Sequence, residues 1–139
     1  MSRTLLIIKP DAVQRKLVGH VIGRLEMAGF RIVGMRMLTL TEEKARSFYA
    51  VHTGKPFLES LVKFMTSGPV VPILLEKERA VDDLRALIGA TDPKKAACGT
   101  IRQEIALDIE KNSVHASDSD ENAVVEISHF FQDICPGQS

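Results

Sequence analysis

Residues 5–8 restrict the fold more than any other part of this sequence. They form an unbroken apolar run, Leu-Leu-Ile-Ile, which Lys9 and Pro10 bring to a stop. A short apolar run bounded by proline is typical of a strand buried on both faces, so both faces of its sheet need cover. The stretch "SGPVVPILLE" predicts another buried strand, in which Pro72 indicates an edge position or a bulge. Between them, "FRIVGMRMLTL" is rich in β-forming residues and predicts a further strand.

Helical patterns separate these strands. Apolar residues recur at helical spacing from Val18 to Ala28, and Gly29 stands where a C-terminal helix cap belongs. Thr41, which two glutamates follow, predicts another helix start. Pro56 predicts the first residue of the next helix. The apolar face of that helix would contain Phe57, Leu58, Leu61, Val62 and Met65.

The second half of the chain completes the pattern. A short helix with Leu84 and Ile88 is predicted to end at Gly89, and residues 89–112 predict a long surface loop. Within that loop, Thr100 and Gln103 fit a capping box for one or two helical turns. A last short strand at residues 113–115 leads into a final helix. This order predicts an α/β (α+β) sandwich of ferredoxin-like split βαβ topology: a four-stranded antiparallel sheet covered by helices, in one domain over residues 1–139.

Composition excludes several classes of protein. Formal net charge is zero, so no global field attracts the chain to nucleic acid or a membrane, and any anion site must be local. Cys98 and Cys135 match no metal-site spacing or disulfide framework. The first apolar run is too short for a signal sequence or a membrane span. We therefore expect a cytoplasmic protein with free thiols that does not bind membranes.

His115 stands just before a helix start that is rich in carboxylates. Asp118, Asp120 and Glu121 are most simply read as residues that satisfy free N–H groups there, with Ser117 or Asp118 as the cap. A metal site is the alternative, but the spacing matches no zinc, EF-hand or His-x-x-x-His pattern.

His115 itself has two readings. A lone His beside a strand is usually structural, whereas a helix N-terminus next to it would attract an anion and disfavour the imidazolium. A neutral imidazole that faces a bound anion is suited to nucleophilic attack on phosphorus. Glu126 could orient the ring if the fold brings it near.

Four further residues could complete a phosphate site. Lys9 ends the first strand, Arg85 and Thr91 follow the third, and Arg102 lies behind Gly99, where backbone can approach a ligand closely. Each alone is more typical of a solvated surface residue. Spacing does not establish that they converge.

Taken in order, the motifs of the chain resemble the nucleoside diphosphate kinase family over nearly the entire length. These motifs are "IIKPDAV", "YAVHTGKPF", "MTSGPVV", "GTIR" and "NSVHASDS". The last is similar to the family's Asn-x-x-His-Gly-Ser-Asp signature, which is highly specific. The resemblance implies a ferredoxin-like fold and transfer of the γ-phosphoryl of a nucleoside triphosphate to a nucleoside diphosphate, by a ping-pong route through phosphohistidine.

The resemblance also implies a role for each matching residue. His115 would be the nucleophile, Glu126 would bond the other ring nitrogen, and Ser117 would support that carboxylate. Tyr49 would lie near the catalytic His. Phosphates, ribose and base would be held by the remaining residues, which are Lys9, His52, Phe57, Leu61, Arg85, Thr91, Arg102, Ile109 and Asn112. Of these, Phe57 and Ile109 would clamp the base without reading its edges, so we expect broad base tolerance.

Cofactor and partners follow from the same resemblance. Mg²⁺ would be carried on the nucleotide phosphates, with no direct protein ligand. The substrates would be nucleoside tri- and diphosphates such as ATP, ADP and GDP. A homo-oligomer is expected, either a tetramer or a hexamer built on a dimer.

The sequence departs from the family pattern at three places. Ala116 stands where the family usually has Gly; a positive φ there would cost Ala about 1 kcal/mol, so we expect a negative φ. Cys98 replaces the usual Pro before "GTIR", which should loosen the long loop. "LLEKERAV" lacks the small residue that the family often has after the third strand, so we expect a different turn. The short tail after Cys135 resembles that of bacterial members.

Three other classes of function stay open at this point. A ligand-binding module of the same fold would need the phosphate contacts but not His115. A nucleic-acid-binding protein is disfavoured by zero net charge, a single Tyr and no basic stripe. A metal-dependent hydrolase would release phosphate and lose activity without a protein-bound metal.

Overall fold

The computed structural model describes residues 1–133, which contain four strands and eight helices. Cys135, one of the two expected free thiols, and the tail around it lie outside the described residues. In chain order the elements are β1 (Ser2–Ile8), α1 (Pro10–Gln14), α2 (Val18–Met27), β2 (Arg31–Met35), α3 (Glu42–Phe48), the 3₁₀ helix η1 (Ala50–His52), α4 (Leu58–Met65), β3 (Val71–Lys77), α5 (Ala80–Ile88), α6 (Ile101–Ile105), β4 (Val114–Ala116) and α7 (Asp120–Phe130).

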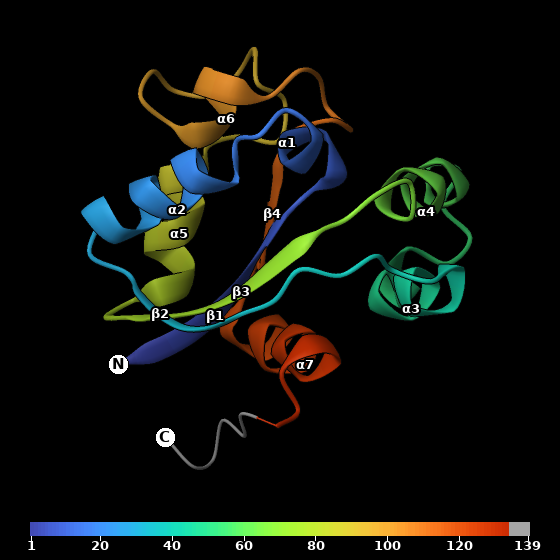
Figure 1. Ribbon diagram of the computed structural model, residues 1–139, viewed down its shortest axis with the longest axis horizontal. Helices are drawn as coiled ribbons and strands as arrows, with labels where there is room; N and C mark the ends of the chain where they lie inside the picture. The colour runs from blue at the N-terminus through green and yellow to red at the C-terminus, as the bar shows by residue number, and fades with distance from the viewer. Residues whose placement is uncertain (134–139) are drawn as a thin grey trace.

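The strands form one antiparallel sheet in the order β2-β3-β1-β4 (Figure 1). β1 lies in the middle, paired with β3 along its whole length and with β4 near its end. Two central strands that are not consecutive in the chain define the split βαβ arrangement. The predicted ferredoxin-like sandwich with a four-stranded antiparallel sheet is therefore confirmed.

Helices cover both faces of the sheet, which explains the apolar run at the start of the chain. Leu5 and Ile7 of β1 point into a core formed with α3, α4 and α7. Leu6 and Ile8 point into a second core, formed with α2, α5 and α6. All of these side chains are fully buried. Figure 1 shows α2 and α5 on one side of the sheet and α7 on the other.

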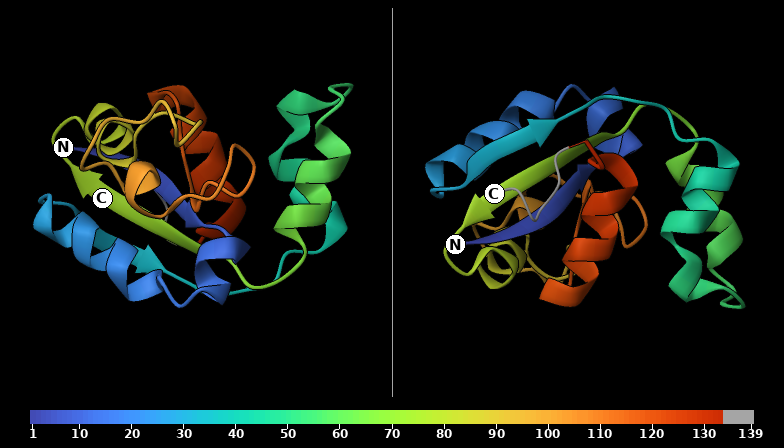
Figure 2. Two further views of the ribbon diagram at one scale, coloured as in Figure 1. Left: turned by 90° about the horizontal axis from the view of Figure 1, so that it is seen from above. Right: turned by 90° about the horizontal axis from the view of Figure 1, so that it is seen from below.

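α3 and α4 form a helical hairpin at one end of the molecule, where both views of Figure 2 show them side by side. Phe48 and Val62 are among the side chains through which the hairpin packs on the core. None of the helices within residues 1–133 is long and apolar enough to cross a membrane.

Most of the predicted helix boundaries are confirmed. The hydroxyls of Thr41 and Thr100 each accept a hydrogen bond from the backbone N–H three residues on, so they cap α3 and α6. Gly29 follows α2 at φ 93°, and Gly89 caps α5 at φ 87°. A positive φ is easily reached by glycine, which explains its place at both ends.

Two predicted helix starts are wrong. Pro56 lies in a turn before α4, whose N-cap is Phe57. Neither Ser117 nor Asp118 caps α7: the cap is Ser119, whose hydroxyl accepts from a backbone N–H three residues on. Ser117 is fully buried and its hydroxyl donates elsewhere, so it is not available as a cap.

The prediction that Pro72 marks an edge strand or a bulge is also wrong. β3 is a central strand, and the irregularity in its pairing with β2 lies between Ile32 and Gly34. The Pro72 carbonyl accepts from the backbone N–H of Arg36, just past the end of β2. The N–H and C=O groups of a strand residue point to the same side, so an N–H at residue 72 would point toward β2. Its absence therefore removes no hydrogen bond between β3 and β1.

The structure places each of the three departures from the family pattern. Ala116 lies in β4 and is not among the residues with positive φ, as expected. In the turn before α5, Arg79 adopts a left-handed conformation at φ 54°, a position that favours glycine. The side chain of Cys98 is exposed.

Candidate active site

The His115 ring is held by a chain of two hydrogen bonds. β4 alternates, so Val114 and Ala116 enter the core while His115 points to the opposite face, toward α7. His115 Nε2 lies 2.8 Å from Oε1 of Glu126, and the buried hydroxyl of Ser117 donates to the same oxygen, also at 2.8 Å. A carboxylate accepts, so Nε2 carries the ring proton and Nδ1 carries the lone pair. Within residues 1–133, nothing is hydrogen-bonded to Nδ1.

Aromatic side chains fix the other faces of this ring. Phe48 meets His115 edge to face at 5.3 Å between centroids, and Tyr49 meets it at 6.2 Å and 90°. Burial, with the nearby charge of Glu126, raises the pKa of Tyr49, so the phenol stays neutral. Its hydroxyl is buried and has no partner among the described residues. The imidazole therefore has little freedom to rotate, which favours one reactive geometry.

Lys9 is a buried cation that lines the same cleft as His115. It follows β1 and is only 6% exposed. Its ammonium donates to Oδ1 of Asn112 at 2.9 Å, and the Asn112 amide donates to the Ile109 carbonyl at 2.8 Å. Burial, together with the positive charge of Arg102, lowers the pKa of Lys9 to about 8. An anion bound here would relieve both effects.

Two guanidinium groups line the same cleft. Arg102, on α6, is buried and donates to the carbonyls of Gly89 at 3.1 Å and Val114 at 2.7 Å. Burial and the charge of Arg85 lower the pKa of Arg102 to about 10. Arg85 is exposed in the last turn of α5, and its guanidinium makes no ion pair or hydrogen bond within the described chain. Two positive charges that act on each other in this way are typical of a site that binds an anion.

A cleft of about 550 Å³ collects these groups. All but one of the residues that the sequence nominated line it; the exception, Ser117, lies behind Glu126. The nominated residues in its wall are Lys9, Tyr49, His52, Phe57, Leu61, Arg85, Thr91, Arg102, Ile109, Asn112, His115 and Glu126. Phe57 and Ile109 are about half exposed, at 46% and 60%, so two apolar side chains are presented at this cleft.

Sequence reasoning missed other residues of the cleft wall. Phe48 was not singled out, because an aromatic residue on an amphipathic helix most simply fills the core. Glu110 was missed because it belongs to a loop without a recognisable motif. The other members of the wall are Val51, Ala116, Asp118, Asn122 and Val125. Within residues 1–133, no group of three or more His, Cys, Asp or Glu side chains could hold a metal ion.

This combination defines a class of protein. An imidazole whose Nδ1 has no partner within residues 1–133, in one cleft with a buried ammonium and two guanidiniums, is equipped to receive a phosphoryl group and to stabilise the charge that spreads over its oxygens. The fold and the cleft together define a ferredoxin-like phosphotransferase.

Comparisons with known proteins identify the family. The nucleoside diphosphate kinase family model matches residues 2–134. The nucleoside diphosphate kinase of Anaeromyxobacter sp. (strain K) is 54% identical over 134 residues, which are 96% of this chain and 91% of that protein. That of Chlorobium limicola is 56% identical over 131 residues, 94% of each chain.

Solved structures agree with this result. The Aquifex aeolicus nucleoside diphosphate kinase superimposes with a TM-score of 0.91 at 44% identity, over 94% of each chain. A halophilic nucleoside diphosphate kinase from Halobacterium salinarum, solved in complex with CDP, gives 0.91 at 42% identity over 95% of this chain and 88% of that one. The chain belongs to the nucleoside diphosphate kinase family, whose members transfer a phosphoryl group between nucleotides through a phosphohistidine.

Proposed function

We propose that His115 carries the phosphoryl group and that its Nδ1 is the nucleophile. The observation that supports this most strongly is the pair of 2.8 Å contacts to Glu126, one from His115 Nε2 and one from the Ser117 hydroxyl. The first contact engages Nε2, and the second holds the carboxylate in place, so the lone pair of Nδ1 is left for the substrate.

The first half-reaction needs no proton transfer. Nδ1 attacks the γ-phosphorus of a nucleoside triphosphate, an N–P bond forms, and the bond from phosphorus to the β–γ bridging oxygen breaks. The nucleoside diphosphate leaves with that electron pair. The ring gains positive charge, which the carboxylate of Glu126 offsets through the Nε2–H bond. In the second half, a β-phosphate oxygen of another nucleoside diphosphate attacks the same phosphorus and the N–P bond breaks.

Each cation of the cleft has a proposed part in this reaction. The guanidinium of Arg85 has no partner in the described chain, so both arms of its fork can bind phosphate oxygens. Arg102 uses part of its fork to hold backbone carbonyls and keeps further N–H groups for the substrate. Lys9 lies next to Asn112, and we assign this pair to the phosphates and the ribose hydroxyls. His52 and Thr91, also in the wall, would contact phosphate oxygens.

The base would lie between Phe57 and Ile109, with Leu61 beside it. Stacking on apolar side chains tolerates any base, so purine and pyrimidine nucleotides should all be substrates. Mg²⁺ would be held by the nucleotide phosphates rather than by a cage of protein ligands, which agrees with a cleft rich in cations. When bound, it would neutralise phosphate charge.

Beyond the site, we propose a single domain over residues 1–139, a cytoplasmic location and a homo-oligomer, either a tetramer or a hexamer built on a dimer. Analytical ultracentrifugation at several concentrations would separate these assemblies. A monomer or dimer at every concentration would contradict the proposed tetramer or hexamer.

Initial-rate kinetics test the proposed reaction. With Mg-ATP as donor and dTDP, GDP or CDP as acceptor, double-reciprocal plots at several fixed donor concentrations should give parallel lines, as a ping-pong mechanism requires. Intersecting lines would show that both nucleotides bind before transfer and would contradict the covalent intermediate. Release of free phosphate in place of transfer would favour a hydrolase.

A further inference from the structure

The two walls of the nucleotide cleft come from separate parts of the chain. His52, Phe57 and Leu61 belong to the segment of η1 and α4, whereas Ile109 and Asn112 belong to the loop that follows α6. The proposed base site therefore depends on the distance between α4 and this loop.

The loop wall is held firmly by its own bonds. Asp108 accepts at one carboxylate oxygen from the backbone N–H groups of Glu110 at 3.0 Å and Lys111 at 2.7 Å. Asn112 binds the Ile109 carbonyl on one side and the Lys9 ammonium on the other. Its position is thus tied to β1 and the catalytic region.

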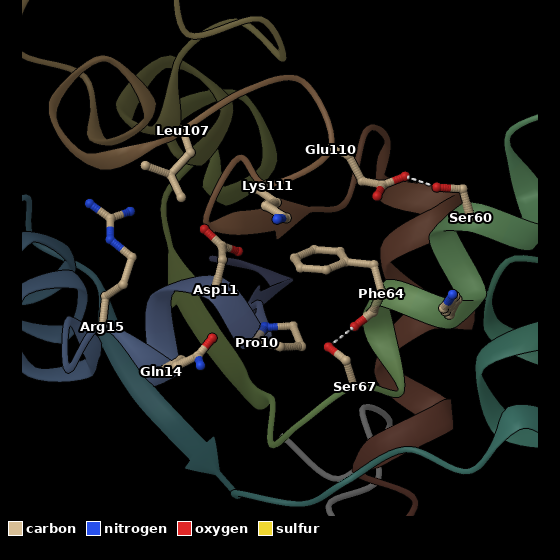
Figure 3. A pocket seen from close by; sticks show the side chains of 11 residues that line it. Pro10, Asp11, Gln14, Arg15, Ser60, Phe64, Ser67, Leu107, Glu110 and Lys111 are labelled. Atoms are coloured by element: carbon tan, nitrogen blue, oxygen red, sulfur yellow. Dashed lines mark hydrogen bonds between the residues drawn. The ribbon is translucent and has the colours of Figure 1, made fainter.

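The α4 wall is held differently. Leu58, Val62 and Met65 pack into the core. Phe57 is exposed in the wall of the cleft, and Ser60 is exposed in the neighbouring pocket. Within residues 1–133, one hydrogen bond joins residues 42–65 to the loop of residues 106–112: the Ser60 hydroxyl donates to Oε2 of Glu110 at 2.6 Å. Figure 3 shows this bond across the gap between α4 and the loop.

Glu110 is the point where the two walls meet. It lines the nucleotide cleft, and it also lines the neighbouring pocket drawn in Figure 3, together with Pro10, Phe64 and Lys111. The side chain of Glu110 is half-buried and that of Ser60 is exposed, so the bond between them lies at the surface.

We propose that Ser60 and Glu110 are positioning residues that hold the base-binding mouth at the width of a nucleotide base. This inference rests on the proposed function, because it assumes that the base lies between Phe57 and Ile109. Neither residue touches the reacting atoms. The pair raises nucleotide affinity by holding the α4 wall and the loop wall at a fixed separation before the nucleotide binds.

Substitutions can separate this bond from the charge of Glu110. Ser60→Ala removes the donor and leaves the carboxylate. Glu110→Gln keeps an acceptor oxygen and removes the negative charge, which partly offsets the lowering of the Lys9 pKa. Ser67→Ala is the matched control, because the Ser67 hydroxyl bonds only the Phe64 carbonyl of its own turn within the described chain (Figure 3).

We expect Ser60→Ala and Glu110→Ala to raise the KM for nucleoside diphosphates roughly threefold with kcat unchanged, which is the loss expected for one hydrogen bond of this kind. The double variant Ser60→Ala/Glu110→Ala should raise the KM no more than either single variant does, because both remove the same bond. Glu110→Gln keeps the bond, so it should raise the KM less than Glu110→Ala does. Ser67→Ala should behave as wild type. Additive losses, or a fall in kcat with an unchanged KM, would overturn the proposal.

A ligand without a base gives the sharpest readout. In Ser60→Ala, the Kd for ADP from equilibrium dialysis should rise about threefold, while the Kd for tripolyphosphate stays at the wild-type value. Equal weakening of both ligands would mean a general structural role and would overturn the proposal. Dialysis needs no turnover, so this result stands apart from the fate of the phosphohistidine mechanism.

Discussion

Lys9 is predicted to reduce the stability of the fold, and replacing it with Met should make the protein harder to unfold while weakening phosphate binding. Burial lowers the pKa of Lys9 from 10.5 to about 8. At about 1.4 kcal/mol per pKa unit, this difference corresponds to about 3 kcal/mol against the folded state when Lys9 is charged. Met is unbranched and close in length, so it can fill the same space without a charge.

The gain from Lys9→Met is smaller than this full value. The Asn112 amide oxygen, which accepts from Lys9 at 2.9 Å, would be left without that donor. An unpaired buried acceptor costs roughly 1–3 kcal/mol. We therefore expect a net gain of up to about 2 kcal/mol in the free energy of unfolding at pH 7.

The pH dependence has a definite sign. The folded-state pKa of Lys9 lies below its unfolded-state value, so the penalty is complete below about pH 8 and disappears as pH rises toward 10.5. The advantage of Lys9→Met over wild type should shrink through that window. Urea unfolding of both proteins at pH 7 and pH 10 measures it, with the exposed Lys95→Met as control. A variant that is less stable than wild type by the same amount at both pH values would refute the reasoning.

Three further perturbations test other parts of the site. Glu126→Gln should lower kcat roughly 10–100-fold with little change in the Kd for ADP, because the amide no longer offsets the charge on the His115 ring. Rapid quench-flow measures the rate. A Kd that rises as much as kcat falls would contradict this role. Gly89→Ala should lower the free energy of unfolding by about 2–4 kcal/mol in urea titrations, since Gly89 has a φ of 87° and a Cβ there would lie 2.5 Å from the Thr100 hydroxyl; a loss under about 1 kcal/mol would contradict it. Ala116→Gly should lower Tm by a few degrees, equivalent to about 1 kcal/mol, and leave kcat unchanged, because Ala116 lies in β4 without a positive φ; a faster enzyme would mean that its methyl group hinders the reaction.

Much of this fold could be predicted from local sequence patterns. The apolar run at residues 5–8 predicted a strand covered on both faces, and helices do cover both faces of the sheet. Pro72 misled the prediction because its effect depends on where the neighbouring strand ends, which is a property of the assembled sheet. Ser117 and Ser119 both precede α7, and only the three-dimensional position of Glu126 decides which of them caps the helix and which donates to the carboxylate.

The candidate site was predictable for a different reason. Spacing alone did not bring Lys9, Arg85 and Arg102 together; the resemblance of the motifs nominated them, and the fold places them in one cleft. The Ser60–Glu110 bond could not be predicted, because it joins two segments whose contact depends on the path of a loop without a motif.

The central claim is that His115 carries the phosphoryl group. The most direct measurement is the mass of the intact protein after brief incubation with Mg-ATP and no acceptor, for wild type and His115→Ala. We predict a gain of one phosphoryl group in wild type only, which is lost in acid, kept in alkali and discharged by added GDP. No adduct on wild type under conditions where ATP demonstrably binds, or the same adduct on His115→Ala, would contradict the claim.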